Sequence, residues 1–200
     1  MMYLPELDTL PPSKAKLIQT CLTLMSAQGY ESTGIQEILS QAEVSKSNFY
    51  YHYPSKEALF LDTLERYIHG FIHGKLQTTL LNKSLSPKER IYQFCLEVYE
   101  VMMCQSCQVG CPFVNLATET SDFFPAFREQ LSAFFARFKA FFTACIAEGI
   151  AMGEFKPTLN PEEAGALFLS AFHGSLIYAK TTRNPQGIRQ NAELLLTLLS

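Results

Sequence analysis

The sequence predicts an all-α protein of about nine helices, in which a small N-terminal three-helix module is joined to a C-terminal helical bundle. Three observations predict this fold class. Apolar residues recur at spacings of three and four along most of the chain, which is the period of an amphipathic helix. No stretch alternates apolar and polar residues for long, so strands are not supported. Prolines and glycines divide the chain into segments of helical length.

Composition excludes several classes of protein. The chain has 200 residues, of which 48% are hydrophobic, and this is enough to build a core. No apolar run approaches the roughly 18–20 residues that span a bilayer, and the N-terminus lacks the basic and apolar regions of a signal peptide. We therefore expect a cytosolic protein with no membrane partner, in which the six cysteines are reduced thiols or metal ligands.

The first helix is expected over residues 13–29, with Gly29 at its C-terminal end. Its buried stripe consists of Leu17, Ile18, Cys21, Leu24 and Met25. Ser32 and Thr33 are good N-cap residues for a second, short helix. We expect that helix to end at a break formed by residues 42–44.

Ser45 is expected to cap a third short helix, which continues through Tyr53 and ends at Pro54. Ser55 then caps a long fourth helix, which we expect to continue to about Leu80. The helices expected in the rest of the chain lie at 87–104, 112–119, 125–152, 161–180 and from the turn at Asn184-Pro185 to the last leucines.

Three short helices, with a break of only a few residues between the second and the third, suggest a helix-turn-helix. Its inward face consists of Ile35, Ile38, Leu39, Val44, Phe49 and Tyr53. The third helix directs another set partly or wholly outward, namely Ser45, Lys46, Ser47, Asn48, Tyr50, Tyr51 and His52. The cation, hydroxyls, amide and aromatic rings of this second set can reach base edges, thymine methyls and phosphates in a major groove.

The sequence from Val44 to Leu59, VSKSNFYYHYPSKEAL, resembles the signature of the TetR family of transcriptional repressors, and the match covers residues 13–60 without gaps. The resemblance implies a helix-turn-helix DNA-binding domain at 1–54 and an effector-binding and dimerisation domain at 55–200. It also implies a homodimer that binds a palindromic double-stranded DNA operator and releases it when a small-molecule effector binds.

The resemblance also implies which residues contact DNA. Four positions match base-reading residues of the family, namely Lys46, Ser47, Asn48 and Tyr51. Four others match residues that contact phosphate or the groove wall, namely Thr33, Tyr50, His52 and Lys56. With Ser45 at the start of the third helix, these residues form the predicted DNA-binding set.

Charge constrains how such a protein binds DNA. The net charge is −3 and the first arginine is Arg66, so bulk charge does not drive binding. Glu43 stands in the turn where the family often has glycine, which would relieve a positive φ, and it places a negative charge beside the DNA-facing side. We expect few phosphate contacts and no bidentate arginine–guanine readout from the third helix.

Cys104, Cys107 and Cys111 form a C-x2-C-x3-C cluster, for which three interpretations are open. A zinc site would need a fourth ligand from elsewhere in the fold. A thiol sensor would use Cys111, because the Gly-Cys-Pro sequence places its thiol at a helix N-terminus, where the helix dipole stabilises a thiolate. The third interpretation is simple burial. Residues 110–119 are similar to a TetR subgroup that responds to electrophiles through a cysteine in an equivalent Gly-Cys setting.

The remaining candidate sites lie in the C-terminal part of the chain. An effector pocket would be lined by Phe94, Tyr99, Met103, Phe113, Phe134, Phe138 and Phe172, with Asn115, Glu119 and His173 as polar groups. Such walls imply a small effector that is apolar, aromatic or electrophilic. The last two helices, which form the dimer interface in the family, carry Phe168, Phe172, Leu176, Leu195 and Leu199. The alternative for these five residues is packing within one subunit.

Metal binding and catalysis have weaker support in the sequence. His69 and His73 lie on one helix face, as metal-binding pairs do, but we expect a solvated face there. The rival function is a small thiol- or metal-dependent enzyme, or a metal sensor, that uses the three clustered cysteines. The sequence has no Gly-rich phosphate loop, no G-x-S-x-G motif and no catalytic cluster of histidines and carboxylates. We therefore expect no enzyme activity, no cofactor and no metal site.

Overall fold

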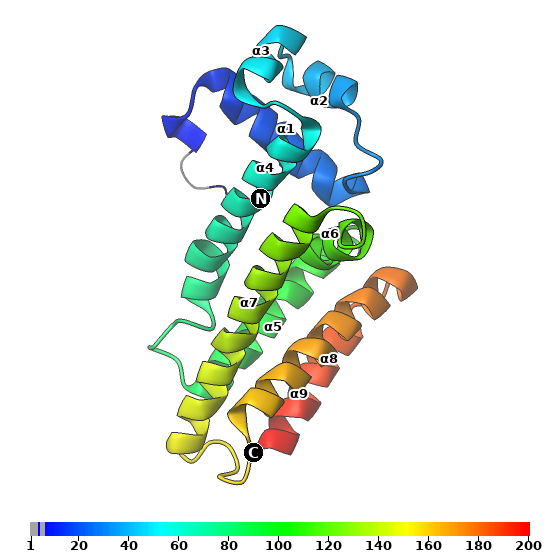
Figure 1. Ribbon diagram of the computed structural model, residues 1–200. Coiled ribbons are helices and arrows are strands. Elements are labelled where there is room, and N and C mark those ends of the chain that lie inside the picture. The colour runs from blue at the N-terminus through cyan, green and yellow to red at the C-terminus, as the bar shows by residue number, and fades with distance from the viewer. Residues whose placement is uncertain (1–3, 5–6) are drawn as a thin grey trace. The chain divides into compact units, whose positions relative to one another are not determined.

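The structure is a computed structural model that describes residue 4 and residues 7–200. In this part of the chain it contains nine α-helices and no strand, as the sequence predicts (Figure 1). The α-helices are α1 (Pro12–Gln28), α2 (Ile35–Ala42), α3 (Lys46–His52), α4 (Lys56–Gly70), α5 (Pro87–Cys104), α6 (Pro112–Thr120), α7 (Pro125–Ala151), α8 (Pro161–Thr182) and α9 (Gln186–Leu199). Two short segments are a 3-10 helix, η1 (Leu7–Thr9), and a π-helix, η2 (Phe71–Leu76). None of the described helices is long and apolar enough to cross a membrane.

The chain forms two compact units. The first contains the chain up to His73 together with Pro112–Leu131, and the second contains Gly74–Cys111 and Ser132–Ser200. Helix α6 and the start of α7 therefore belong to the same unit as the N-terminal helices. The predicted boundary between residues 54 and 55 separates a DNA-binding domain from an effector-binding and dimerisation domain. That division by function stays a prediction.

The core of the first unit forms where α1 packs against α2, α3 and α4, which Figure 1 draws from blue to cyan. Its fully buried side chains include Leu17, Ile18, Ile38, Phe49 and Phe60. Ser45 and Ser55 cap α3 and α4 as predicted, because each hydroxyl accepts a hydrogen bond from the backbone N–H three residues later. The turn between α2 and α3 has a φ of 54° at Glu43, a conformation that glycine would adopt without strain.

The predicted cap of α2 is wrong. The N-cap residue is Gly34, and no side chain makes a cap hydrogen bond there. The Thr33 hydroxyl instead donates to the Gly29 carbonyl at 2.6 Å, and Ser32 is exposed. The hydroxyl of Thr33 therefore closes the end of α1 and is not available to the first turn of α2.

The fourth helix changes its helix type before the predicted end near Leu80. Helix α4 ends at Gly70 and is followed by the π-helix η2, so no regular α-helix continues to Leu80. Glycine is a poor helix former, and Gly70 and Gly74 lie on either side of the point where the helix type changes. A π-helical turn at this place widens the backbone without interrupting the chain's helical course.

The second unit contains α5, most of α7, α8 and α9, and α9 contacts both α5 and α8. Five buried rings contact one another at centroid distances of 5.1 to 5.6 Å, namely Phe94, Phe138, Phe142, Phe168 and Phe172. At the start of α5, Ser86 and Glu89 form a capping box, with Pro87 as the first helical residue.

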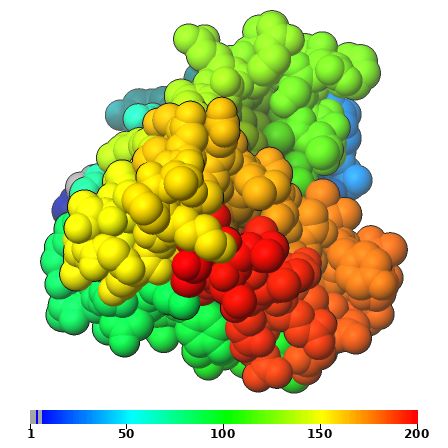
Figure 2. Space-filling view, turned by 90° about the horizontal axis from the view of Figure 1, so that it is seen from below, coloured from blue at the N-terminus to red at the C-terminus, as the bar shows by residue number. Residues whose placement is uncertain are grey.

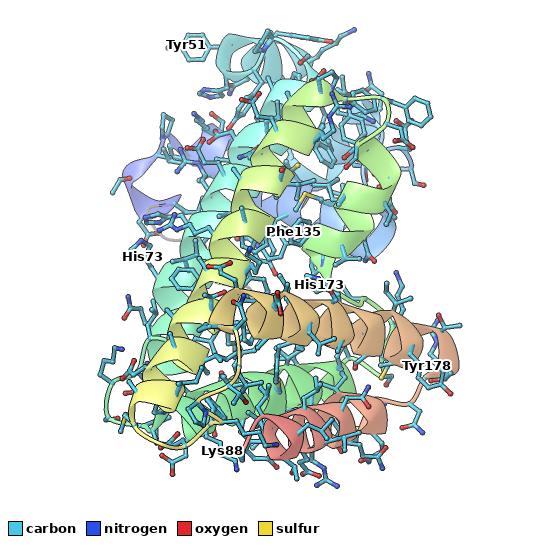
Figure 3. The ribbon with its side chains drawn as sticks, turned by 60° about the horizontal axis from the view of Figure 1, so that its bottom comes forward. Tyr51, His73, Lys88, Phe135, His173 and Tyr178 are labelled. Carbon is cyan, nitrogen blue, oxygen red and sulfur yellow. The ribbon has the colours of Figure 1, made fainter. Side chains whose placement is uncertain are left out.

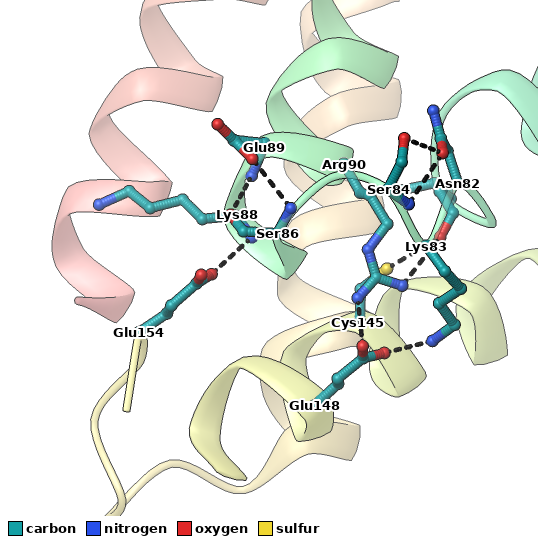
Figure 4. Close-up of polar contacts among 11 residues, drawn as sticks. Asn82, Lys83, Ser84, Ser86, Lys88, Glu89, Arg90, Cys145, Glu148 and Glu154 are labelled. Atoms are coloured by element: carbon teal, nitrogen blue, oxygen red, sulfur yellow. Dashed lines mark hydrogen bonds and ion pairs between the residues drawn. The ribbon is translucent and has the colours of Figure 1, made fainter. Parts of the chain in front are cut away.

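A buried cation lies near the start of α5. Arg90 is only 1% exposed, and its guanidinium reaches the Glu148 carboxylate at 2.8 Å and the Leu80 carbonyl at 3.4 Å (Figure 4). Hydrogen bonds from Arg90 and then from Lys83 hold the pKa of Glu148 below its usual value. The Cys145 thiol donates to the same Leu80 carbonyl at 3.3 Å. A buried guanidinium needs such a partner, so this carboxylate is a structural requirement of the second unit.

Candidate functional sites

Helix α3 presents its polar side chains to solvent as the sequence predicts. Tyr51 is 83% exposed and projects from the end of α3 in Figure 3. Phe49 is fully buried and fixes the opposite side of the helix in the core. The exposed or partly exposed residues are Ser45, Lys46, Ser47, Asn48, Tyr50, Tyr51 and His52. The outward side thus combines one cation with hydroxyl, amide and aromatic groups, which are the donor and acceptor types that read DNA.

Polar contacts hold α3 in place at its C-terminal end. The Ser13 hydroxyl of α1 lies 2.8 Å from Nε2 of His52. Tyr53, which follows α3, donates its hydroxyl to the Asp62 carboxylate of α4 at 2.6 Å. Burial opposes ionisation of Asp62, but the Tyr53 hydrogen bond and the nearby Arg66 outweigh it and lower the pKa of this carboxyl. Helix α3 is therefore anchored to both α1 and α4, which keeps its outward side in a fixed orientation.

The loop between α1 and α2 is held by a carboxylate from α6. Glu119 accepts hydrogen bonds from the Tyr30 N–H at 2.9 Å and from the Glu31 N–H at 2.7 Å. Gly29 makes this approach possible, because a Cβ atom at that position would lie 2.4 Å from Oε2 of Glu119. Glu119 was predicted to line an effector pocket, and its contact with this loop was not predicted. The partners are 88 and 89 residues apart, so no local pattern signals their pairing.

The same loop is held from another side by Lys56 at the start of α4. Its ammonium donates to the carbonyls of Tyr30 at 2.9 Å and Thr33 at 3.1 Å, and lies 4.0 Å from the centre of the Tyr30 ring. Thr33 is fully buried. Both residues were predicted to contact phosphate, and that role stays a prediction. In this structure their polar groups stabilise the loop that leads into α2.

The acidic turn residue has a basic neighbour. Glu43 is exposed, and its carboxylate lies 3.5 Å from the Lys16 ammonium of α1. Lys14 is paired with Asp62 at 3.3 Å. Lys46 is the exposed cation on the first turn of α3 itself. This distribution fits a helix that reads bases with few phosphate contacts.

The three clustered cysteines differ in their exposure. Cys104 is exposed, Cys111 is partly exposed and Cys107 is only 1% exposed. Helix α6 begins at Pro112, so Cys111 stands immediately before its first turn, as predicted. Among the described residues, no group of three or more histidine, cysteine or acidic side chains is arranged to hold a metal ion.

An open depression of about 520 Å³ lies at the end of α5. It is lined by Met103, Ser106, Cys107, Gln108, Arg183 and Pro185. The Arg183 guanidinium donates to the Cys107 carbonyl at 2.8 Å, and Met103 is 50% exposed there. Of the predicted pocket residues, Met103 is the one that lines this depression, and Cys107 contributes from the predicted sensor cluster.

The other predicted pocket residues are divided between the two units. Phe113, Asn115 and Glu119 belong to the first unit, where Phe113 stacks on Tyr67 at 4.8 Å. In the second unit, the Tyr99 hydroxyl accepts a hydrogen bond from Gln186 at 3.1 Å. The buried members of the second unit are Phe94, Phe134, Phe138 and Phe172, whose rings contact one another. Their contacts are those of a packed core.

His173 is the polar group among these aromatic residues. Its ring lies 5.4 Å from that of Phe135 and 5.8 Å from that of Phe172, and Figure 3 shows it beside Phe135. Burial lowers the pKa of His173 to about 4, so the imidazole is neutral near pH 7. Its Nε2 atom is buried and has no hydrogen-bond partner among the described residues. It therefore offers one hydrogen-bonding atom within aromatic surroundings.

The last two helices present two different apolar faces. Four of the five residues predicted for a dimer interface are buried inside the chain, namely Phe168, Phe172, Leu176 and Leu199, and Leu195 is partly buried. The burial of these four residues fits the alternative interpretation, in which they pack within one subunit. The apolar residues left exposed on α8 and α9 are Leu167, Ile177, Tyr178, Leu194 and Leu198. Figure 2 shows α8 (orange) and α9 (red) side by side at the surface of the second unit.

Family models match both parts of the chain. Residues 17–63 match the model described as bacterial regulatory proteins of the tetR family. Residues 87–195 match the model described as the tetracyclin repressor-like C-terminal domain. The second match alone covers more than half of the chain, and the first contains the whole helix-turn-helix.

Individual proteins show the same likeness. The chain is 26% identical over 179 residues to the HTH-type transcriptional repressor DhaR of Mycobacterium sp. strain GP1, a match that covers 90% of this chain and 88% of DhaR. It is 32% identical over 114 residues to the repressor NemR of Escherichia coli K12, 55% of each chain. A regulatory protein TetR from Rhodobacter sphaeroides has a TM-score of 0.87 and 25% identity, over 95% of this chain and 100% of that chain. The reduced form of E. coli NemR has a TM-score of 0.83 at 21% identity, over 94% of this chain and 98% of that one, which shows the shared fold.

Proposed function

This chain belongs to the TetR family of transcriptional regulators, and we propose that it is a dimeric repressor that reads a palindromic operator with α3 and releases it when Cys111 is modified. Its relatives are transcriptional regulators and not enzymes. The observation that carries the proposal is the exposed polar side of α3, which is anchored to α1 and α4. DNA binding and repression follow from family membership, whereas the dimer, the operator symmetry and the chemistry of release are the proposed parts.

The proposed dimer uses the exposed apolar face of α8 and α9. Leu194 and Leu198 are each 58% exposed and lie one turn apart on α9. On α8, Tyr178 is 64% exposed, and a Cβ atom at Gly174 would have no neighbour within 4 Å. A small residue beside large apolar ones allows a second helix pair to approach closely. A two-fold axis would place the same face of a second copy against it, which gives two recognition helices for a palindrome.

Glutamate at both Leu194 and Leu198 is expected to convert the dimer to a monomer. Each substitution occurs twice in a two-fold interface, and burying one leucine is worth roughly 1.5–3 kcal/mol, so dimer dissociation should be favoured by at least about 100-fold. Light scattering after size-exclusion chromatography measures the mass. The matched control is Met152→Glu, which adds the same charge at an apolar residue that is 61% exposed just after α7. The control should remain a dimer, and a dimer that survives the double substitution would contradict this interface.

The proposed release mechanism starts at Cys111. This residue immediately precedes α6, and α6 carries Glu119, whose carboxylate holds the loop that leads into α2. An electrophile that adds covalently to the Cys111 sulfur would alter the first turn of α6 and, through Glu119, the position of the helix-turn-helix. Buried thiols do not compete, because burial raises the pKa of Cys21 to about 12 and also raises the pKa values of Cys95 and Cys145.

Treatment of the native protein with N-ethylmaleimide is expected to modify Cys104 and Cys111 and to release DNA. The Cys111→Ser variant should keep its DNA affinity within about twofold after treatment, because it lacks the thiol that acts on α6. The Cys104→Ser variant, which retains Cys111, should still release DNA. Mass spectrometry identifies the modified residues, and fluorescence anisotropy measures DNA binding. Release from the treated Cys111→Ser protein would overturn the mechanism.

A further inference from the structure

His69 and His73 form an exposed pair at the junction of two helix types. His69 lies in the last turn of α4 and His73 lies in the π-helix η2. Both residues are exposed, and their ring centroids are 4.2 Å apart with an angle of 42° between the planes. Figure 3 shows His73 at the surface of the first unit. The helix therefore brings two imidazoles together where solvent ions can reach them.

Two neighbouring imidazoles are a chelating ligand for particular cations. Neutral imidazole suits divalent copper, nickel and zinc, and two histidines four residues apart on a helix are a recurrent metal-binding arrangement. Hard cations such as Mg²⁺ and Ca²⁺ prefer oxygen ligands and would not be bound here. No third histidine, cysteine or acidic side chain completes a site at this place among the described residues. Water would thus fill the other coordination positions.

A metal ion bound by this pair would act on the point where α4 meets η2. Helix α4 begins in the helix-turn-helix module, where Lys56 holds the loop before α2, and it ends at Gly70. Between the two histidines the backbone changes from α-helix to π-helix, and π-helical turns are frequent at functional sites. The division between the two compact units falls between His73 and Gly74. An ion bound by both imidazoles would tie the last turn of α4 to the first turn of η2.

We propose that His69 and His73 bind one imidazole-preferring divalent transition-metal ion per chain, and that the bound ion restrains the junction between α4 and η2. This site uses none of the residues assigned to DNA binding, dimerisation or thiol modification. It therefore stands or fails independently of the proposed repressor mechanism.

Isothermal titration of the tag-free full-length chain with Ni²⁺ tests the site. A background with Cys104→Ser and Cys111→Ser removes the accessible thiols as competing ligands. We expect one equivalent of Ni²⁺ to bind, and either His69→Gln or His73→Gln to weaken binding by at least about tenfold, because each variant keeps only one imidazole. The matched control is His52→Gln in α3, which should bind as the background protein does. Undiminished binding in either pair variant, or no Ni²⁺ binding by the background protein, would overturn the site.

Hydrogen exchange tests the restraint separately. With Ni²⁺ bound, the amides of residues 70–76 should exchange at least about threefold more slowly than in the metal-free protein, because opening of this turn would have to break a metal–imidazole bond. The same amides should not respond to Ni²⁺ in the His73→Gln variant. Binding that requires both histidines but leaves these exchange rates unchanged would contradict the proposed restraint.

Discussion

Alanine at both Asn48 and Tyr51 is expected to weaken operator binding by at least about 30-fold, because a good base contact is worth about 1–3 kcal/mol and two are removed. Both side chains stand on the outward side of α3, and Tyr51 is 83% exposed. The helix itself depends on Phe49 in the core and on the Ser45 cap, neither of which is changed. Affinity should therefore fall while the unfolding midpoint stays the same.

Fluorescence anisotropy with the operator measures the affinity, and thermal unfolding measured by circular dichroism checks the fold. The matched control is Phe123→Ala, which removes an aromatic ring that is 77% exposed in the turn between α6 and α7. We expect that variant to bind DNA like the unchanged protein. If the double variant binds within about threefold of the unchanged protein, α3 does not read the operator.

Gly29→Ala is expected to lower the free energy of unfolding of the first unit by about 2–5 kcal/mol. Gly29 has a φ of 84° and a ψ of −171°, a region that only glycine adopts readily. The new methyl group would also lie 2.4 Å from Oε2 of Glu119, so the carboxylate would have to leave the Tyr30 and Glu31 N–H groups. Backbone strain and the loss of charge-assisted hydrogen bonds therefore both contribute to the expected loss of unfolding free energy.

Two further glycine variants separate these contributions in urea unfolding. Gly153→Ala, in the second unit, tests a positive φ without a clash, because Gly153 has a φ of 76° and, apart from its chain neighbours, no atom within 4 Å of its Cβ position. Gly34→Ala carries neither, since its φ is −88° and its Cβ position is open. The expected order of stability loss is Gly29 first, then Gly153, then Gly34. A loss at Gly29 no greater than that at Gly153 would show that the Glu119 contact contributes little.

Local signals in the sequence predicted most of the helix-turn-helix correctly. The serine caps of α3 and α4, the positive φ at Glu43 and the outward side of α3 each depend on residues within a few positions of one another. Such features are fixed by hydrogen bonds and sterics that a short sequence already contains. The predicted cap of α2 was wrong because the Thr33 hydroxyl donates to the Gly29 carbonyl instead.

Contacts between residues that lie far apart in the sequence could not be predicted from it. Glu119 lies 89 residues from Tyr30, and nothing near either residue indicates that one accepts a hydrogen bond from the other. The spacing of apolar residues also could not show which of the two apolar faces of α9 is buried. Leu195 and Leu199 were predicted to face a partner, yet Leu194 and Leu198 are the exposed leucines. Where a helix has leucines on adjacent positions, only packing decides which of them faces the core.

Selection of bound duplexes from a random DNA pool tests the central claim most directly. In the proposed dimer, two α3 helices related by a two-fold axis would read the same bases in opposite orientation, so the protein should enrich one sequence with two symmetric half-sites. The Asn48→Ala, Tyr51→Ala double variant should enrich no such sequence. Failure of the unchanged protein to enrich a palindrome, or enrichment of the same palindrome by the double variant, would contradict operator recognition by α3.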